Sequence, residues 1–216
     1  MRFFTRRECL VPTVWGWCAI ALLAVIGCGV YVFSIHQFLS PVHPVESEIL
    51  VVEGWIPEYA LQQTAGDFNR GRYRVLVVTG GPLETGHFLT GYGSLAHVGA
   101  ATLQKLGIDS SKIVAVPSVF VQKDRTYEEG MALKKWLLQS APGIKSLTLY
   151  SLGCHSRRSQ LLYSKALGRD YTIGIVACPS RDYDSRRWWH FSNGVRAVAD
   201  ETMAYVYALL FFVFGS

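Results

Sequence analysis

Residues 146–158 read SLTLYSLGCHSRR and join a compact apolar run to the start of a more polar, amphipathic stretch. The run 146–150 predicts a buried strand, Gly153 marks a turn, and the stretch from His155 to Leu167 predicts a helix. Strand, turn and helix in this order are typical of α/β proteins, in which ligands bind at the carboxyl ends of parallel strands. The segment therefore predicts both the fold class and the position of a site.

The same alternation recurs on both sides of this segment. The other predicted strands, each a compact apolar run typical of strands covered on both faces, are residues 48–52, 74–79, 112–116 and 171–177. The other predicted helices are residues 57–69, 92–106 and 127–140. Gly71, Gly107 and Gly168 lie just past helix ends, where a left-handed residue commonly closes the last turn. The expected fold is a Rossmann-like three-layer α/β sandwich with a mainly parallel sheet.

The composition excludes several classes of protein. The chain has 216 residues, of which 50% are hydrophobic and 17% charged. Such a chain is too apolar to be disordered and long enough to bury a core without metal or disulfide staples. The formal net charge is +5, but Arg2, Arg6, Arg7 and Glu8 precede an apolar segment, which leaves 18 basic against 15 acidic residues. This excess is too small to indicate a nucleic-acid groove, so we expect no nucleic-acid partner.

The N-terminal region predicts a membrane span. No Asp, Glu, Lys or Arg occurs from Cys9 to Val45, and residues 14–35 read VWGWCAIALLAVIGCGVYVFSI. About 20 apolar residues suffice to cross a bilayer as a helix. The preceding arginines favour a cytoplasmic N-terminus at residues 1–10, a transmembrane signal anchor at residues 11–36 and an extracytoplasmic remainder. The lipid bilayer is therefore an expected partner.

Two other interpretations of this segment are open. A cleavable signal peptide usually has a shorter apolar region of about 7 to 15 residues and a small-residue cleavage site. The tetrad ending at Cys28 resembles a lipoprotein box, but an apolar stretch follows it instead of a polar tether. We therefore favour the uncleaved anchor. Pro41 and Pro44 predict a short, stiff linker at residues 37–46, followed by one domain at residues 47–216.

The candidate site residues lie just after the predicted strands, at one edge of the sheet. The candidate ligand-binding residues are Glu53, Gly54, Thr79, Gly80, Gly81, Asp124, Arg125, Thr126 and Arg158. Glycine N–H groups and helix N-termini attract anions, and arginine is a forked donor for phosphate or carboxylate. The pattern predicts an anionic small-molecule or lipid-linked ligand. Tight turns and solvated helix surface explain each residue taken singly, but their common position favours a site.

The candidate catalytic residues are His155 and Glu128. His155 lies at a strand-to-helix junction beside glycine, cysteine and arginine, and it is either a general acid or base or merely a helix cap. The segment from Asp124 reads as a helix start, with Thr126 as the cap and Glu129 completing a capping box. A carboxylate there, Glu128, is predicted to face the crevice. His87 is a loop residue that either covers the crevice or lies in solvent.

Sharper catalytic signals are absent from the sequence. It contains no nucleophile elbow, no Walker-type phosphate loop and no paired-histidine zinc motif, so we predict no metal site and assign no cofactor. Cys154 and Cys178 follow strands that are candidate neighbours, so an oxidising compartment allows a disulfide between them. The competing idea is a reactive Cys154 at the helix N-terminus.

The C-terminal region predicts one long helix at residues 193–214. Its apolar tail is too short to span a bilayer, so we expect it to pack on the sheet in preference to entering the membrane interface. Just before it, an aromatic and basic cluster centred on Trp188 and Trp189 is typical of an interface. This cluster keeps a protein partner open as an alternative.

The motifs together resemble the YdcF-like family of bacterial envelope proteins. The resemblance covers residues 48–168, and its specific parts are Glu53-Gly54, Thr79-Gly80-Gly81, Asp124-Arg125-Thr126-Tyr127-Glu128, and Cys154-His155-Ser156-Arg157-Arg158 followed by Lys165-Ala166-Leu167-Gly168. It implies a Rossmann-like fold behind a single anchor in the bacterial inner membrane, and a part in cell-envelope biogenesis. It implies no settled reaction, although one member is associated with S-adenosylmethionine.

Three functions compete at this point. The leading expectation is a membrane-anchored protein that binds or processes a phosphorylated or lipid-linked envelope precursor, as a hydrolase or transferase. The second is a non-catalytic scaffold that binds another envelope protein through its anchor and apolar tail. The third is a nucleotide or S-adenosylmethionine binder that faces the cytoplasm.

Overall fold

The computed structural model of the protein describes residues 10–71, 73–86 and 91–212. The chain divides between Ile35 and His36 into two compact units. The first consists chiefly of helix α1 (Val14–Leu39), which is long and apolar enough to cross a membrane. The basic N-terminal flank and His87, both named above, lie outside the described residues.

The second unit contains a six-stranded sheet in the order β1-β6-β5-β2-β3-β4. The strands are β1 (Val42–His43), β2 (Ile49–Glu53), β3 (Val75–Gly80), β4 (Ile113–Pro117), β5 (Ser146–Leu152) and β6 (Thr172–Cys178). All neighbouring pairs are parallel except β1 with β6. Because β2 lies between β3 and β5, the chain winds outward from β2 in both directions. The predicted Rossmann-like α/β class is confirmed, and the topological switch point lies between β2 and β5.

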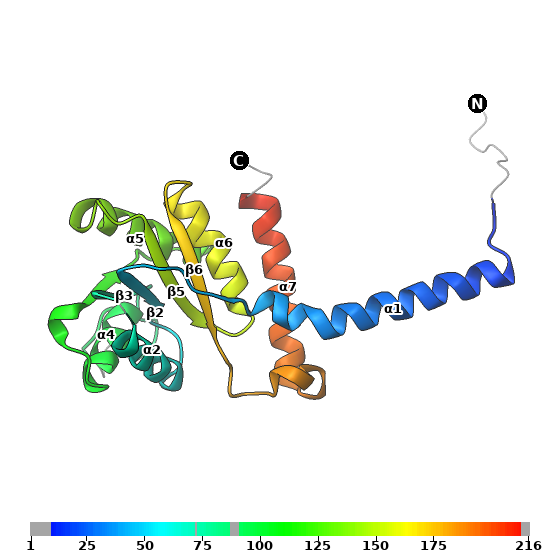
Figure 1. Ribbon diagram of the computed structural model, residues 1–216, viewed down its shortest axis with the longest axis horizontal. Coiled ribbons are helices and arrows are strands. Elements are labelled where there is room, and N and C mark those ends of the chain that lie inside the picture. The colour runs from blue at the N-terminus through cyan, green and yellow to red at the C-terminus, as the bar shows by residue number, and fades with distance from the viewer. Residues whose placement is uncertain (1–9, 72, 87–90, 213–216) are drawn as a thin grey trace, which may run out of the picture. The chain divides into compact units, whose positions relative to one another are not determined.

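Helices cover both faces of the sheet (Figure 1). Helices α2 (Glu58–Arg70) and α4 (Leu95–Lys105) pack on the face that carries Leu50 and Val52. Helices α5 (Arg125–Ser140) and α6 (His155–Leu167) pack on the opposite face, over Ile49 and Val51. Successive residues of the fully buried strand β2 thus point to opposite faces of the sheet, as expected for a β-strand.

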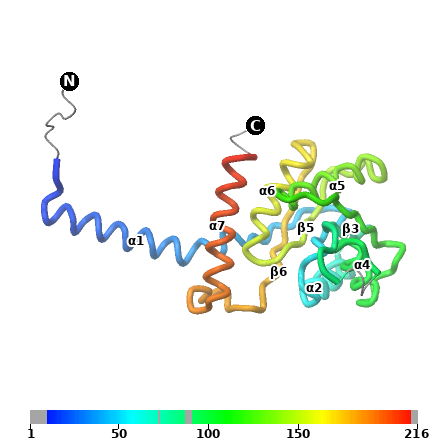
Figure 2. Tube along the Cα trace, turned by 180° about the vertical axis from the view of Figure 1, so that it is seen from behind, coloured from blue at the N-terminus to red at the C-terminus, as the bar shows by residue number. Residues whose placement is uncertain are grey.

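The C-terminal helix is an addition outside these layers. Helix α7 (Ser192–Phe212) directly follows a short 3-10 segment, η2 (Ser185–His190). The other 3-10 segment, η1 (Ser110–Lys112), lies before β4. Helix α7 lies beside α6 (Figure 2), so the prediction that it packs on the sheet is wrong. The sheet face is already occupied by α5 and α6, and α7 therefore packs on the outer side of α6.

Several helix ends differ from their predicted positions. Helix α4 begins at Leu95, because the Ser94 hydroxyl caps it by accepting a hydrogen bond from the His97 N–H. Asp124 adopts a left-handed conformation with φ of 59°, so α5 begins at Arg125 instead of Tyr127. Gly107 and Gly168 have positive φ, as predicted, whereas Gly71 is extended.

The expected linker at residues 37–46 is instead part of the folded unit. The side chain of Leu39 is buried, and Val42 and His43 pair with β6 as an edge strand. The Thr148 hydroxyl donates to the Val45 carbonyl at 3.0 Å. The prolines do not prevent this docking, since Pro suits edge strands and irregular segments. The folded unit therefore begins at His36, ten residues before the predicted boundary at Glu46.

This docking predicts the effect of Gly174→Ala. A methyl group at position 174 lies 2.5 Å from the backbone nitrogen of Val45, so residues 44–45 must move off the sheet. We expect the free energy of unfolding of the full chain in detergent to fall by about 1–3 kcal/mol, the usual cost of overpacking. The control is Gly143→Ala, whose new methyl group meets nothing within 4 Å. Equal stability of both variants in urea denaturation would show that residues 44–45 do not pack there.

Candidate functional site

A cavity of about 610 Å³ opens at the carboxyl edge of the sheet. Its walls come from the segments after β2, β3, β4 and β5 and from one side of α7. Six of the predicted site residues line it: Gly81, Asp124, Arg125, Thr126, His155 and Arg158. The lining that the structure describes does not include the other five, which are Glu53, Gly54, Thr79, Gly80 and Glu128. The strand-end rule thus predicts the location of the cavity but only part of its wall.

Gly54 and Gly80 serve close packing. A methyl group on Gly54 would lie 2.4 Å from the Leu95 carbonyl oxygen, and one on Gly80 would lie 2.6 Å from the Ala96 nitrogen. Both positions therefore need glycine because the start of α4 approaches the ends of β2 and β3. This approach gives the two glycines a structural role and leaves Gly81 as the glycine of the turn that reaches the cavity.

The carboxyl group that faces the cavity from α5 belongs to Glu129. Because α5 starts at Arg125, the side chain of Glu129 turns inward, is only 6% exposed and cannot complete the predicted capping box with Thr126. Burial raises the pKa of Glu129 to about 8, and the negative charge of Glu53 adds to this rise. Hydrogen bonds from Tyr163 Oη and the Gly81 N–H offset part of it. Glu129 is therefore a protonated acid at neutral pH.

Glu53 lies at the end of β2 and is fully buried behind the cavity. The hydroxyl groups of Ser151 and Ser159 both donate to its carboxylate, the second at 2.8 Å. Thr79 Oγ1 and Tyr163 Oη share a hydrogen bond of 2.7 Å, and Tyr163 reaches on to Glu129. Glu53 and Thr79 thus belong to a buried polar network that supports Glu129, and they do not line the cavity.

His155 and Glu201 are a second pair of ionisable residues in the cavity, in addition to Glu129. Nδ1 of His155 lies 2.8 Å from Oε1 of Glu201, a residue of α7. Nδ1 also lies 2.9 Å from Nη2 of Arg158, so Glu201 and Arg158 together fix the orientation of the imidazole. Nε2 is buried and has no hydrogen-bond partner among the described residues. The ring of Trp55 packs edge-to-face on that of His155, with centroids 5.0 Å apart.

Arg158 is held by the same carboxylate. Its Nε and Nη2 atoms donate to Oε2 and Oε1 of Glu201 at 2.8 and 3.0 Å, a bidentate pair. Burial alone would raise the pKa of Glu201, but the hydrogen bonds from His155 and Arg158 outweigh burial and lower that pKa to about 2. The guanidinium of Arg158 is therefore not the free anion clamp that the sequence predicts. Only its Nη1 atom, which has no hydrogen-bond partner among the described residues, is left for a ligand.

A smaller cavity of about 230 Å³ shares the wall made by Trp55, His155 and Glu201. Cys154 lies on this side, 3.6 Å from Tyr183 Oη, and burial raises the pKa of its thiol. Burial likewise raises the pKa of Cys178 to about 12. Both thiols are free. The structure therefore contains no bridge between them, and Cys154 lacks the lowered pKa of a reactive thiolate.

No metal site accompanies these groups in the described parts of the chain. None of the clusters of His, Cys, Asp and Glu side chains found there has three members arranged to hold an ion. The arrangement offers groups for proton transfer, because a protonated carboxyl and an imidazole line one cavity.

Comparison with known proteins adds no assignment. No protein-family model matches the chain, and no curated protein matches it. The fold and cavity define an α/β protein with acid and base groups at its topological switch point, and a function must be argued from that geometry.

Sequence reasoning missed Glu201 and chose Glu128 over Glu129. Glu201 lies 46 residues after His155, on a helix that joins the site through tertiary packing, chiefly on α6. The sequence contains no local signal for that contact. For Glu129 a signal exists, since Asp tolerates the left-handed conformation well and Asp124 fixes where α5 starts.

The ion pairs of Glu201 predict a pH dependence of stability. Its pKa falls from 4.5 in the unfolded chain to about 2 in the folded unit, which is worth about 3 kcal/mol to folding. A depressed acid pKa stabilises the fold fully above pH 4.5, and this contribution is lost as the pH falls toward 2. In urea denaturation, wild type should exceed Glu201→Gln by about 3 kcal/mol at pH 7 and approach it at pH 2.

The matched control for this measurement is Asp200→Asn, because Asp200 is an exposed neighbour on the same helix. We expect this variant to follow wild type across the same pH range. A gap between wild type and Glu201→Gln that stays constant from pH 7 to pH 2 would contradict the ion-pair account.

Proposed function

We propose that the protein is a membrane-anchored hydrolase of the YdcF-like type that acts on a phosphorylated, lipid-linked precursor of the cell envelope. The observation that supports the proposal is that Glu129 and His155 line the same cavity. Their environments differ, since burial raises the pKa of Glu129 and Glu201 orients the imidazole of His155. Two such groups are what acid–base hydrolysis requires.

The proposed reaction is the hydrolysis of a phosphate ester or anhydride. A water oxygen attacks phosphorus and forms the new P–O bond, while Nε2 of His155 accepts one proton of that water. The bond from phosphorus to the bridging oxygen breaks, and Glu129 donates its proton to that oxygen. The proton on the imidazole then returns to Glu129 through solvent, so water supplies all the added atoms. Glu201 remains ionised throughout and orients the imidazole.

The cavity also offers groups that would hold such a ligand. Arg125 pairs with Glu84 at 3.0 Å, but both side chains are more than half exposed, so this pair is weak and can exchange for a phosphate. Arg158 lines the same cavity. Beyond Glu201, the α7 wall includes the apolar residues Ala204, Ala208 and Phe212, which suit the hydrocarbon part of a lipid-linked molecule. A ligand with a charged head and an apolar chain matches both ends of the cavity.

The cellular setting of the proposal rests on the N-terminal segment. Helix α1 is long and apolar enough to span a bilayer, and the arginines before it favour a cytoplasmic N-terminus. The folded unit would then lie on the extracytoplasmic side, where envelope precursors are processed. The resemblance to the YdcF-like family supports the same setting.

The proposal predicts the behaviour of Glu129→Gln with farnesyl diphosphate as the probe. Removing a positioned general acid costs about 10²–10⁴-fold in rate, so phosphate release by the full chain in detergent should fall by that factor. The wild-type rate should also fall above pH 8, as Glu129 loses its proton. The matched variant is Glu128→Gln, one residue away and outside the described lining, which should keep the wild-type rate.

Two results would overturn this assignment. Equal loss in Glu128→Gln and Glu129→Gln would return the acid role to Glu128. Absence of phosphate release would exclude hydrolysis, and ligand-induced thermal stabilisation then separates the alternatives. Stabilisation by farnesyl phosphate alone indicates a lipid-phosphate binder, stabilisation by nucleotides or S-adenosylmethionine indicates the cofactor binder, and stabilisation by none of them indicates the scaffold.

A further inference from the structure

The outer face of α7 carries an exposed apolar stripe, with Arg196 and Asp200 exposed beside it. We define this face as Val195, Ala199, Met203, Val206 and Leu210, which recur every three or four residues, together with Phe211 beside them. Tyr207 lies next to this face and also lines the cavity. Met203 is 64% exposed and Phe211 62%. From residue 195 to residue 210 the stripe is about 22 Å long. A patch of this size on a helix that packs elsewhere indicates a contact surface.

The opposite side of α7 explains why this stripe is not core. Val198 and Ala208 are buried against the folded unit, and Glu201 points to His155 and Arg158. These residues alternate with the stripe at helical spacing, so the packing requirements of α7 are met without it. The exposed apolar residues therefore have no role in holding the described unit together.

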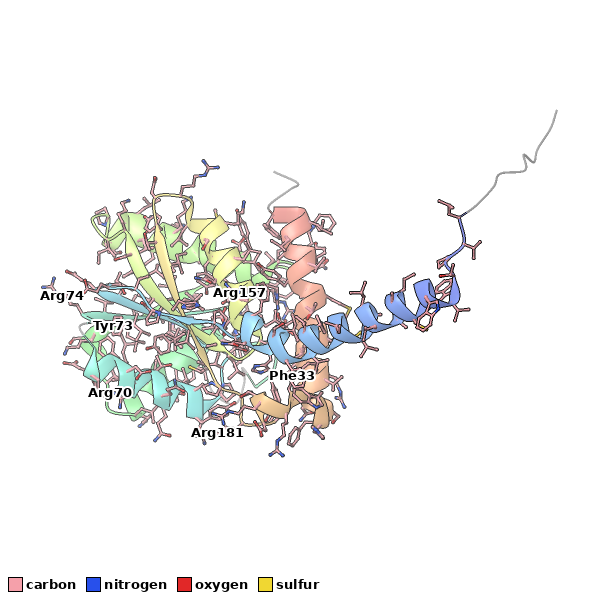
Figure 3. All side chains as sticks on the ribbon, turned by 45° about the vertical axis from the view of Figure 1, so that its right-hand side comes forward. Phe33, Arg70, Tyr73, Arg74, Arg157 and Arg181 are labelled. Carbon is pink, nitrogen blue, oxygen red and sulfur yellow. The ribbon has the colours of Figure 1, made fainter. Side chains whose placement is uncertain are left out.

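The part of the chain that follows the proposed membrane span contacts α7 within the folded unit. The ring of Phe38 lies 5.5 Å from that of Tyr205 on α7, in an edge-to-face contact. Arg157 of α6 (Figure 3) donates from Nε to the Phe38 carbonyl at 2.8 Å and lies over the Phe38 ring. Phe38 follows the end of the 14–35 span by three residues, about 5 Å of helix. The residue that α7 contacts is therefore only three positions along the chain from the proposed span.

The flanks of the stripe suit anionic lipid. Arg186 and Arg196 are exposed near its N-terminal end, where Asp200 is the exposed acidic residue of the same helix, so the basic charge is in excess. Tyr207 and Phe211, with ring centroids 4.5 Å apart, lie near its C-terminal end. Basic residues beside an apolar helical face, with aromatic side chains on that face, are typical of helices that lie in the membrane interface.

From these observations we infer that the outer face of α7 lies on an anionic bilayer surface. The inference rests on the proposed anchoring by α1 but not on any catalytic step. It deepens the proposed function in one respect, because the cavity-lining residues Ala204 and Ala208 belong to the same helix. A lipid-linked ligand could then pass from the bilayer along α7 into the cavity.

The test is photo-crosslinking of the full chain in vesicles. The analogue p-benzoylphenylalanine is placed at position 211, and the protein is reconstituted in phosphatidylcholine vesicles that contain phosphatidylglycerol. Irradiation should give a lipid adduct, detected by mass spectrometry. The control carries the analogue at position 138, where Leu138 of α5 is similarly exposed at 55%. We expect a clear excess of lipid adduct at position 211 over position 138.

A second variant ties the adduct to the stripe. Burial of one leucine side chain is worth about tenfold in an equilibrium constant, so Leu210→Glu should lower the adduct at position 211 by about tenfold. Equal adduct at positions 211 and 138, or a crosslinked dimer in place of a lipid adduct, would overturn the inference. Neither result would affect phosphate release from farnesyl diphosphate in detergent, so failure here is distinguishable from failure of the proposed function.

Discussion

The burial of two carboxyl groups beside each other, Glu53 and Glu129, is the constraint on which the rest of the site depends. A buried carboxylate is costly unless donors compensate it, and the fold supplies two serine hydroxyls to Glu53. Glu129 accepts hydrogen bonds from the Tyr163 hydroxyl and one backbone N–H, and the negative charge of Glu53 helps to keep Glu129 protonated. The ends of β2 and β5 must meet helices α5 and α6 for this arrangement to exist. The protonated state of Glu129 therefore depends on the whole fold.

Helix α7 completes the site from outside the sheet. Its residue Glu201 satisfies Arg158 and His155 together, and the lowered pKa of this carboxylate is the consequence. Without α7, two basic side chains at the start of α6 would lack their partner. The same helix carries an apolar stripe on its outer face. One helix therefore contacts the imidazole of the cavity on one side and, as we infer, lipid on the other.

The sequence predicts this molecule well where the signal is local. Compact apolar runs identify the strands, and the junction at Gly153 locates His155 at the edge of the cavity. Contacts between distant segments are not predictable in this way, which is why the role of Glu201 and the docking of the chain near Val42 were missed. The sequence analysis assigned the inward carboxyl to Glu128 and not to its neighbour Glu129, because the start of α5 depends on a single backbone angle at Asp124.

The central claim is that Glu129 is protonated at neutral pH within the cavity. Infrared difference spectroscopy of the full chain tests it directly, because a protonated carboxyl has a C=O stretching band that a carboxylate lacks. The account predicts such a band at pH 7 that disappears as the pH rises through about 8 and is absent from Glu129→Gln. A wild-type spectrum at pH 7 that matches that of Glu129→Gln in this region would contradict the account.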